Sequence, residues 1–204
     1  MQRPTTDQLR EQVRGSVITP ADDGYDEARA VYNAMIDRRP AVIVGARDAA
    51  DVAVAVDFAR EGELPLAIRG GGHSVPGFGT IDDGVVIDLA GMRSVTVDPE
   101  TRVARASGGA TWGDFNAATH EYDLATTGGI ISTTGVAGLT LGGGIGYLTR
   151  GHGLACDNLI GADVVTADGR TGHASADENA DLLWARKGGS GNFGEATARE
   201  FQLH

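Results

Sequence analysis

The chain has 204 residues, of which 41% are hydrophobic and 22% charged, so it has the size and composition of one large domain or two small lobes. Its formal net charge of −11 argues against a nucleic acid or an anionic membrane as partner, because both are bound through lysine and arginine. The single cysteine, Cys156, excludes an internal disulfide and CxxC metal sites. The sequence has no apolar stretch of membrane-spanning length and no signal-peptide core near Met1, so we expect a cytoplasmic location.

The first third of the chain predicts alternating helices and strands. In chain order we expect a helix over 7–13 capped by Thr5 or Thr6, an extended segment over 16–20, a helix over 25–36, a buried strand over 41–44, a helix over 48–60 and a strand over 64–68. The two apolar strands and the helix between them form a β-α-β unit, which is typical of a parallel pair of strands. The second of these strands leads directly into Gly70.

The rest of the chain predicts short strands separated by helices and glycine-rich loops. We expect strands over 85–89, 94–97 and 102–106, a Thr-capped helix over 111–122, a glycine-rich tract over 128–153, a strand hairpin over 159–174, a helix over 179–186 and an extended segment up to 204. The predicted class is therefore α+β, with lobes at about 1–90 and 91–204 and a ligand between them.

Glycine is the unusual residue of this composition. There are 31 glycines, and the segment Arg69–Ser74 runs three of them directly into His73. Glycine lets a backbone lie close to a ligand with its N–H groups pointing inward, and the histidine adds a nucleophile. The segment therefore predicts an anionic cofactor that is both bound and covalently tethered. On this segment alone, a solvent-exposed glycine turn with an incidental histidine is the alternative.

Two familiar nucleotide-binding motifs are absent from the sequence. The G-x-G-x-x-G pattern would need glycine in place of Val75 or Thr149, and the Gly-Lys-Ser/Thr tripeptide of a P-loop does not occur. What remains is a set of glycine clusters at strand ends, which form concave nests of N–H groups that bind anions without lysine. Two such nests suit a pyrophosphate and reconcile an anionic ligand with an acidic chain.

Several segments, in order, resemble the flavin-binding domain of FAD-linked oxidases of the p-cresol methylhydroxylase and vanillyl-alcohol oxidase type, in the berberine-bridge-enzyme-like branch. They are Arg69–Ser74 with 76–79 and 86–89, the loop 135–146, the segment 154–159 with 167–169, and the segment 187–194. The resemblance covers about residues 15–204. It implies that 1–204 is an FAD-binding domain and that the substrate domain and a C-terminal covering segment of the family are absent from it.

The resemblance also implies a role for each matching residue. His73 corresponds to the histidine that carries FAD through its 8α-methyl group. The residues implied to contact the cofactor are Ile68, Arg69, Gly70, Gly71, Gly72, His73, Ser74, Gly77, Gly135, Gly138, Thr140, Gly142, Gly143, Gly144, Gly146, Asn158 and Val164. For Arg69, packing or a structural ion pair is the favoured interpretation. His152, inside the second glycine region, is the remaining histidine with the best chance of touching the cofactor.

Some residues depart from the family pattern or fall outside it. Ile131 stands where some members carry a second, cysteine tether, which implies a single histidyl linkage, and Thr134 falls near the position that controls oxygen approach. Cys156 is expected to be a small buried residue. We expect a turn at Asp82–Asp83, no metal site, and surface or loop positions for His120, His152 and His173. No catalytic acid or base can be carried over from the family.

The sequence thus predicts an FAD-dependent oxidoreductase domain. It would accept a hydride from an alcohol-, sugar- or phenol-like small molecule and pass electrons to oxygen or another acceptor. The alternatives are a flavin-binding module or enzyme fragment without independent catalysis, and an anion-binding protein that shares the glycine nests by accident. A lobe without its covering domain would expose apolar surface, so we also expect a homo-oligomer or a partner chain over the flavin.

Overall fold

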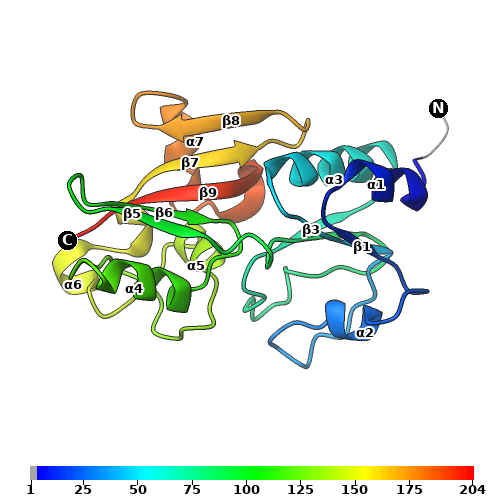
Figure 1. The fold of residues 1–204 in the computed structure, drawn as a ribbon, viewed down its shortest axis with the longest axis horizontal. Coiled ribbons are helices and arrows are strands. Elements are labelled where there is room, and N and C mark those ends of the chain that lie inside the picture. The colour runs from blue at the N-terminus through cyan, green and yellow to red at the C-terminus, as the bar shows by residue number, and fades with distance from the viewer. Residues whose placement is uncertain (1–3) are drawn as a thin grey trace.

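Two β-sheets form the framework of the computed structural model, which describes residues 4–204 (Figure 1). The first sheet has the order β1-β2-β4-β3 and the second β5-β6-β9-β7-β8. The strands are β1 (Ser16–Ile18), β2 (Val42–Gly45), β3 (Leu66–Arg69), β4 (Val85–Asp88), β5 (Val95–Asp98), β6 (Val103–Ser107), β7 (Leu159–Val165), β8 (Thr171–Ser175) and β9 (Glu195–Gln202). The predicted α+β class is confirmed.

Helices cover both sheets (Figure 1). They are α1 (Thr6–Gln12), α2 (Tyr25–Ala28), α3 (Ala49–Glu61), α4 (Trp112–His120), α5 (Val136–Leu141), α6 (Thr149–His152) and α7 (Ala180–Arg186), with short 3₁₀ turns η1 (Ala155–Asn158) and η2 (Ser190–Phe193). The sequence did not predict α5 or α6, because their glycine-rich stretches resemble loops. No helix within residues 4–204 is long and apolar enough to cross a membrane.

The predicted β-α-β unit is present, but its two strands do not pair with each other. β4 lies between β2 and β3 and is parallel to both. The physical reason is the burial of β4, whose residues Val85, Val86 and Ile87 have no solvent exposure. A strand that is apolar on both faces is most stable in the interior of a parallel sheet.

The predicted helix over 25–36 is wrong beyond its first turn, because α2 ends at Ala28. The carbonyl oxygens of Ala28 and Ala30 accept hydrogen bonds from the guanidinium of Arg69, at 2.6 and 3.2 Å. The N–H of Tyr32 donates to the carbonyl of Gly72 at 3.2 Å. These tertiary bonds use groups that a longer helix would need for its own ladder.

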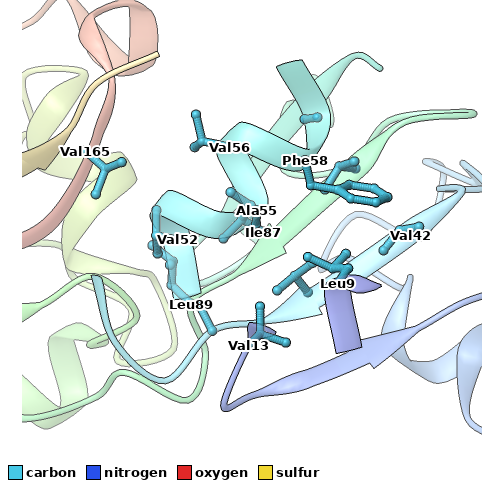
Figure 2. Close-up of a cluster of buried hydrophobic side chains, with 14 residues drawn as sticks. Leu9, Val13, Val42, Val52, Ala55, Val56, Phe58, Ile87, Leu89 and Val165 are labelled. Atoms are coloured by element: carbon cyan, nitrogen blue, oxygen red, sulfur yellow. The ribbon is translucent and has the colours of Figure 1, made fainter. Parts of the chain in front are cut away.

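Helix α3 packs its apolar stripe against the first sheet (Figure 2). Its N-cap, Asp48, accepts from the backbone N–H groups of Ala50 and Asp51, both at 3.0 Å. The same buried cluster includes Val165 from β7, which links the core of the first sheet to the second (Figure 2). Burial of these side chains therefore stabilises the arrangement of the two sheets as well as α3 itself.

A second core lies between the second sheet and helices α4, α5 and α7. Trp112, Phe115 and Phe201 pack edge to face at its centre, with ring centroids 5.2 to 6.3 Å apart. Thr111 begins α4 with a capping box, as its sequence predicts. This core holds α5, and with it the second glycine-rich tract, against the sheet.

Smaller predictions can be checked at single residues. Thr5 caps α1, Cys156 is buried, and Asp82 accepts from the N–H of Arg39 in a bend, as expected of a turn. Burial, together with the charge of Asp157, raises the pKa of the Cys156 thiol. His173 lies half-buried in strand β8, opposite Asp163 of β7, and its Nδ1 lies 2.8 Å from the Asp163 carboxylate.

The capping box of α4 predicts an acid-sensitive contribution to stability. Hydrogen bonds from Arg93, at 2.7 and 3.0 Å, and from Thr111 lower the pKa of Asp114 to about 2. A lowered carboxyl pKa stabilises the fold above the unfolded-state pKa of about 4, and this stabilisation is lost as the pH falls through the folded-state value. We expect Asp114→Asn to lower the free energy of unfolding by about 1 kcal/mol at neutral pH, because solvent screens this partly exposed pair.

Urea unfolding across this pH range tests the prediction, and the difference between wild type and Asp114→Asn should disappear in acid. The matched control is Asp177→Asn, since the exposed Asp177 carboxylate accepts no hydrogen bond from residues 4–204. A difference that persists unchanged at the lowest pH would contradict the assignment.

Candidate functional site

The two glycine loops that the sequence singles out meet where the two sheets adjoin. A Cβ atom on Gly71 would overlap the backbone nitrogen of Gly135, and one on Gly135 would lie 2.5 Å from the nitrogen of Gly71. Such separations are far below the closest normal contact of a Cβ atom, so both positions require glycine. Gly70 also approaches Gly108, the residue after β6 of the second sheet. A Cβ added to Gly70 would lie 3.2 Å from the Gly108 carbonyl oxygen.

The backbone that leaves β3 presents unpaired donors. Gly70, Gly71, Gly72, His73 and Ser74 donate no backbone hydrogen bond to any group within residues 4–204. Gly72 adopts a left-handed conformation with φ of +69°, which helps to curve this segment. Successive free N–H groups on a curved backbone form a nest that binds an anion. The structure therefore leaves free N–H groups where the sequence predicts an anion-binding cradle, and anion binding at this segment stays a prediction.

A groove of about 280 Å³ lies beside this cradle. Its lining comes from segment 27–32, from Arg69–Gly72, and from Asp88 and Ala90. A larger cavity of about 660 Å³ lies elsewhere, against α4 and residues 123–129, with Tyr147 and Leu148. Its lining includes none of the free N–H groups at 70–74, so volume alone does not identify the ligand site.

Arg69 is structural, as its interpretation from sequence favoured. Its side chain is buried and pairs with the Asp88 carboxylate at 2.7 Å, in addition to the two carbonyl groups of segment 28–30. A guanidinium with these partners holds the wall of the groove in place. It leaves the backbone N–H groups as the donors available to an anion.

The imidazole of His73 is held on three sides. Thr133 Oγ1 lies 3.0 Å from Nε2, and Thr134 Oγ1 lies 3.4 Å from Nδ1. The ring of Tyr32 stacks on the imidazole with centroids 4.0 Å apart and planes inclined by 15°. The histidine therefore sits at the junction of the two loops, in contact with Thr133 and Thr134 beside the second loop and with Tyr32 from the segment after α2.

The second glycine tract divides into structural and open positions. Gly144 and Gly146 are needed for packing, because a Cβ would collide with Leu139 and with the Gly128 carbonyl respectively. Gly138 and Gly142 are exposed, and Gly138 has no heavy atom within 4 Å of an added Cβ. Gly143 has a positive φ of +107°. Thr140 is buried on α5, and its hydroxyl has no partner within residues 4–204.

Other predicted cofactor residues have partners inside the protein. The Asn158 amide donates to the carbonyls of His152 and Leu154, both at 2.9 Å, and its oxygen lies 2.7 Å from His204 Nε2. Val164 is buried in β7.

The remaining predicted residues lie near the first loop. Ser74 Oγ accepts from the Phe78 N–H at 3.1 Å, and Gly77 packs on Ile36. Ile68 is half-buried in β3. Cofactor contacts at these positions, and at Asn158 and Val164, stay predictions.

The sequence missed two residues at this site. Tyr32 lies in the part of the predicted helix over 25–36 that does not form, and only the folded chain brings it to His73, 41 positions away. Thr133 carried a signal, since it is a hydroxyl residue two positions before the second glycine loop. His152 stacks on His204 with ring centroids 3.9 Å apart and lines neither cavity. Residues 4–204 contain no cluster of His, Cys, Asp and Glu suited to a metal ion.

Comparison with known proteins shows the family of this chain. Residues 40–175 match the family model described as an FAD binding domain. The chain belongs to this family of FAD-linked oxidoreductases. The match spans the nest, His73 and the second glycine tract, so the FAD-binding domain contains both predicted cofactor loops.

Solved structures of FAD-linked oxidases have the same fold as this chain. It is 38% identical to 6-hydroxy-D-nicotine oxidase from Arthrobacter nicotinovorans, with a TM-score of 0.92 over 94% of the chain. The berberine-bridge-enzyme-like protein 1 of Physcomitrella patens gives a TM-score of 0.93 at 29% identity over 98% of the chain. A glucooligosaccharide oxidase from Acremonium strictum, described with a 6-S-cysteinyl, 8α-N1-histidyl FAD, gives 0.90 at 35% identity over 97%. The chain covers only 42 to 44% of these proteins.

The close approach of the two loops predicts a sharp sensitivity to one methyl group. We expect Gly71→Ala to lower the free energy of unfolding by about 1–3 kcal/mol, because the added Cβ forces the loop of residues 133–135 away. Thermal unfolding and FAD titration measure the effect, and both stability and affinity should fall. In Gly151→Ala, the added methyl meets no atom within 4 Å, so stability should be retained. Equal behaviour of the two variants would contradict the steric argument.

Proposed function

We propose that this FAD-binding domain carries its flavin covalently on His73 and serves the oxidation of an alcohol-, sugar- or phenol-like substrate. The observation that carries the proposal is the position of the His73 imidazole at the end of the nest, between the two glycine loops. A pyrophosphate held by N–H groups of residues 70–74 would place the rest of FAD next to this ring. The related glucooligosaccharide oxidase with its histidyl-linked FAD supports the same role.

FAD, when bound, supplies a ring that accepts a hydride equivalent from the substrate. The chain's own residues bind and orient it. The free N–H groups at 70–74 would donate hydrogen bonds to the pyrophosphate, and Gly138 and Gly142 would leave exposed backbone for the rest of the cofactor. Electrons would then pass to dioxygen or another acceptor.

The covalent linkage is a two-electron oxidation. A C–N bond would form between an imidazole nitrogen of His73 and the 8α carbon, while one C–H bond and one N–H bond are broken. Dioxygen would take up the two electrons and two protons and become hydrogen peroxide. A second linkage through sulfur is unavailable, because the single cysteine, Cys156, is buried in η1 and Ile131 carries no thiol.

Mass spectrometry of the denatured holoprotein tests this function. We expect wild type to retain its yellow colour after denaturation and to gain the mass of FAD, because His73 is bonded to the cofactor. His73→Ala should bind FAD but release it entirely on denaturation. A wild-type chain that releases all its flavin would overturn the covalent assignment.

A second candidate is a flavin-binding module without its own catalysis, since the family model that residues 40–175 match is that of an FAD binding domain. Anaerobic mixing of the flavin-loaded chain with candidate alcohols, sugars and phenols separates the two. Bleaching of the flavin by any of them supports an enzyme. Unchanged colour with every compound supports the module.

A further inference from the structure

The imidazole of His73 is oriented before any cofactor arrives. Its two nitrogens face different hydroxyl groups, Thr133 at 3.0 Å from Nε2 and Thr134 at 3.4 Å from Nδ1. The shorter contact has the length of a normal hydrogen bond, whereas the longer one is at the limit of such an interaction. Thr133 therefore holds its nitrogen more firmly than Thr134 does.

The plane of the ring is fixed by a second residue. Tyr32 stacks on His73 almost in parallel, at 4.0 Å and 15°. The N–H of Tyr32 bonds to the Gly72 carbonyl at 3.2 Å, and the neighbouring Asn33 amide bonds to the Val75 carbonyl at 2.9 Å. These backbone contacts on either side of His73 fasten the segment that carries Tyr32 to the cofactor loop. Tyr32 as a residue is 71% exposed, so burial in a core does not explain its position.

We propose that Tyr32 and Thr133 are positioning residues for the attachment of FAD to His73. Thr133 Oγ1 accepts the hydrogen bond of Nε2–H, which places the reactive lone pair on Nδ1, and Tyr32 keeps the ring plane facing the cofactor. The inference rests on the proposed function, since it concerns how the histidine is prepared for the covalent step.

The covalent attachment of FAD to His73 also requires a proton to leave the imidazole, and Thr133 is placed to assist this loss. A neutral imidazole that attacks through Nδ1 must lose the proton on Nε2. The Thr133 hydroxyl accepts this hydrogen bond beforehand and can rotate to donate to Nε2 afterwards, because a hydroxyl is both donor and acceptor. Valine has the shape of threonine but can do neither, whereas serine can do both.

The test has two readouts, one of which needs no cofactor. In the apoprotein, the ¹⁵N chemical shifts of the His73 ring report which nitrogen carries the proton. We expect Nε2–H in wild type and in Thr133→Ser, and a mixture of tautomers in Thr133→Val. The second readout is the rate at which protein-bound flavin becomes resistant to denaturation after FAD is added.

Thr133→Val should slow the attachment roughly tenfold, the effect of one hydrogen bond on a rate, with Thr133→Ser restoring it. Tyr32→Ala should slow it roughly threefold to tenfold, while Tyr32→Phe keeps the stacked ring and the wild-type rate. The rates are compared at saturating FAD, and the thermal stability of the apoprotein should be unchanged in all four variants. A purely structural role would instead lower this stability.

The two proposals fail in different ways. If wild type binds FAD but never becomes covalently linked, the proposed linkage and the role of Tyr32 in attachment are both wrong, and the tautomer measurement alone then decides whether Thr133 orients the imidazole. Predominant Nδ1–H in wild type would overturn the positioning proposal. So would wild-type attachment rates and ring shifts in both Thr133→Val and Tyr32→Ala.

Discussion

The contact between Gly71 and Gly135 is the constraint on which the site depends. Each backbone occupies the space that a side chain on the other would need. The first loop is anchored by β3 and the second by α5, so this contact joins the two sheets where the cofactor loops lie. Val165 of β7, buried against α3, adds an apolar contact between the second sheet and the core of the first (Figure 2). The junction between the two sheets is thus fixed by the close contact of Gly71 with Gly135 and by the burial of Val165.

Charge favours backbone N–H groups as the donors for an anionic ligand in this groove. The chain carries a net charge of −11, and its one arginine in the groove is committed to Asp88 and two carbonyl groups. Neutral N–H groups, held in a fixed curve by glycines, bind phosphate without lysine or arginine. Arg69 contributes indirectly, because the carbonyl groups that it binds end α2 early and direct segment 29–32 along the groove. The same redirection brings Tyr32 to His73.

How far the sequence predicts this protein depends on the range of the interactions involved. The caps at Thr5, Asp48 and Thr111 act over three residues, so their patterns are visible in the sequence and each of these helices begins where expected. The helix over 25–36 failed because its competitor, Arg69, lies about 40 residues further along the chain. The insertion of β4 between β2 and β3 was equally invisible, since sheet order depends on burial in the assembled core.

The sequence by itself determined the family, the two glycine loops and the identity of His73 as the candidate nucleophile, because glycine clusters and a histidine are properties of local residue type. Only the tertiary structure decided what each residue does within those loops. It separated glycines needed for packing, such as Gly144 and Gly146, from the exposed Gly138 and Gly142, and it assigned Arg69 to the wall of the groove. It also brought Tyr32 and Thr133, distant in the chain, to the same imidazole. Those contacts form between separate elements, so no local pattern could have specified them.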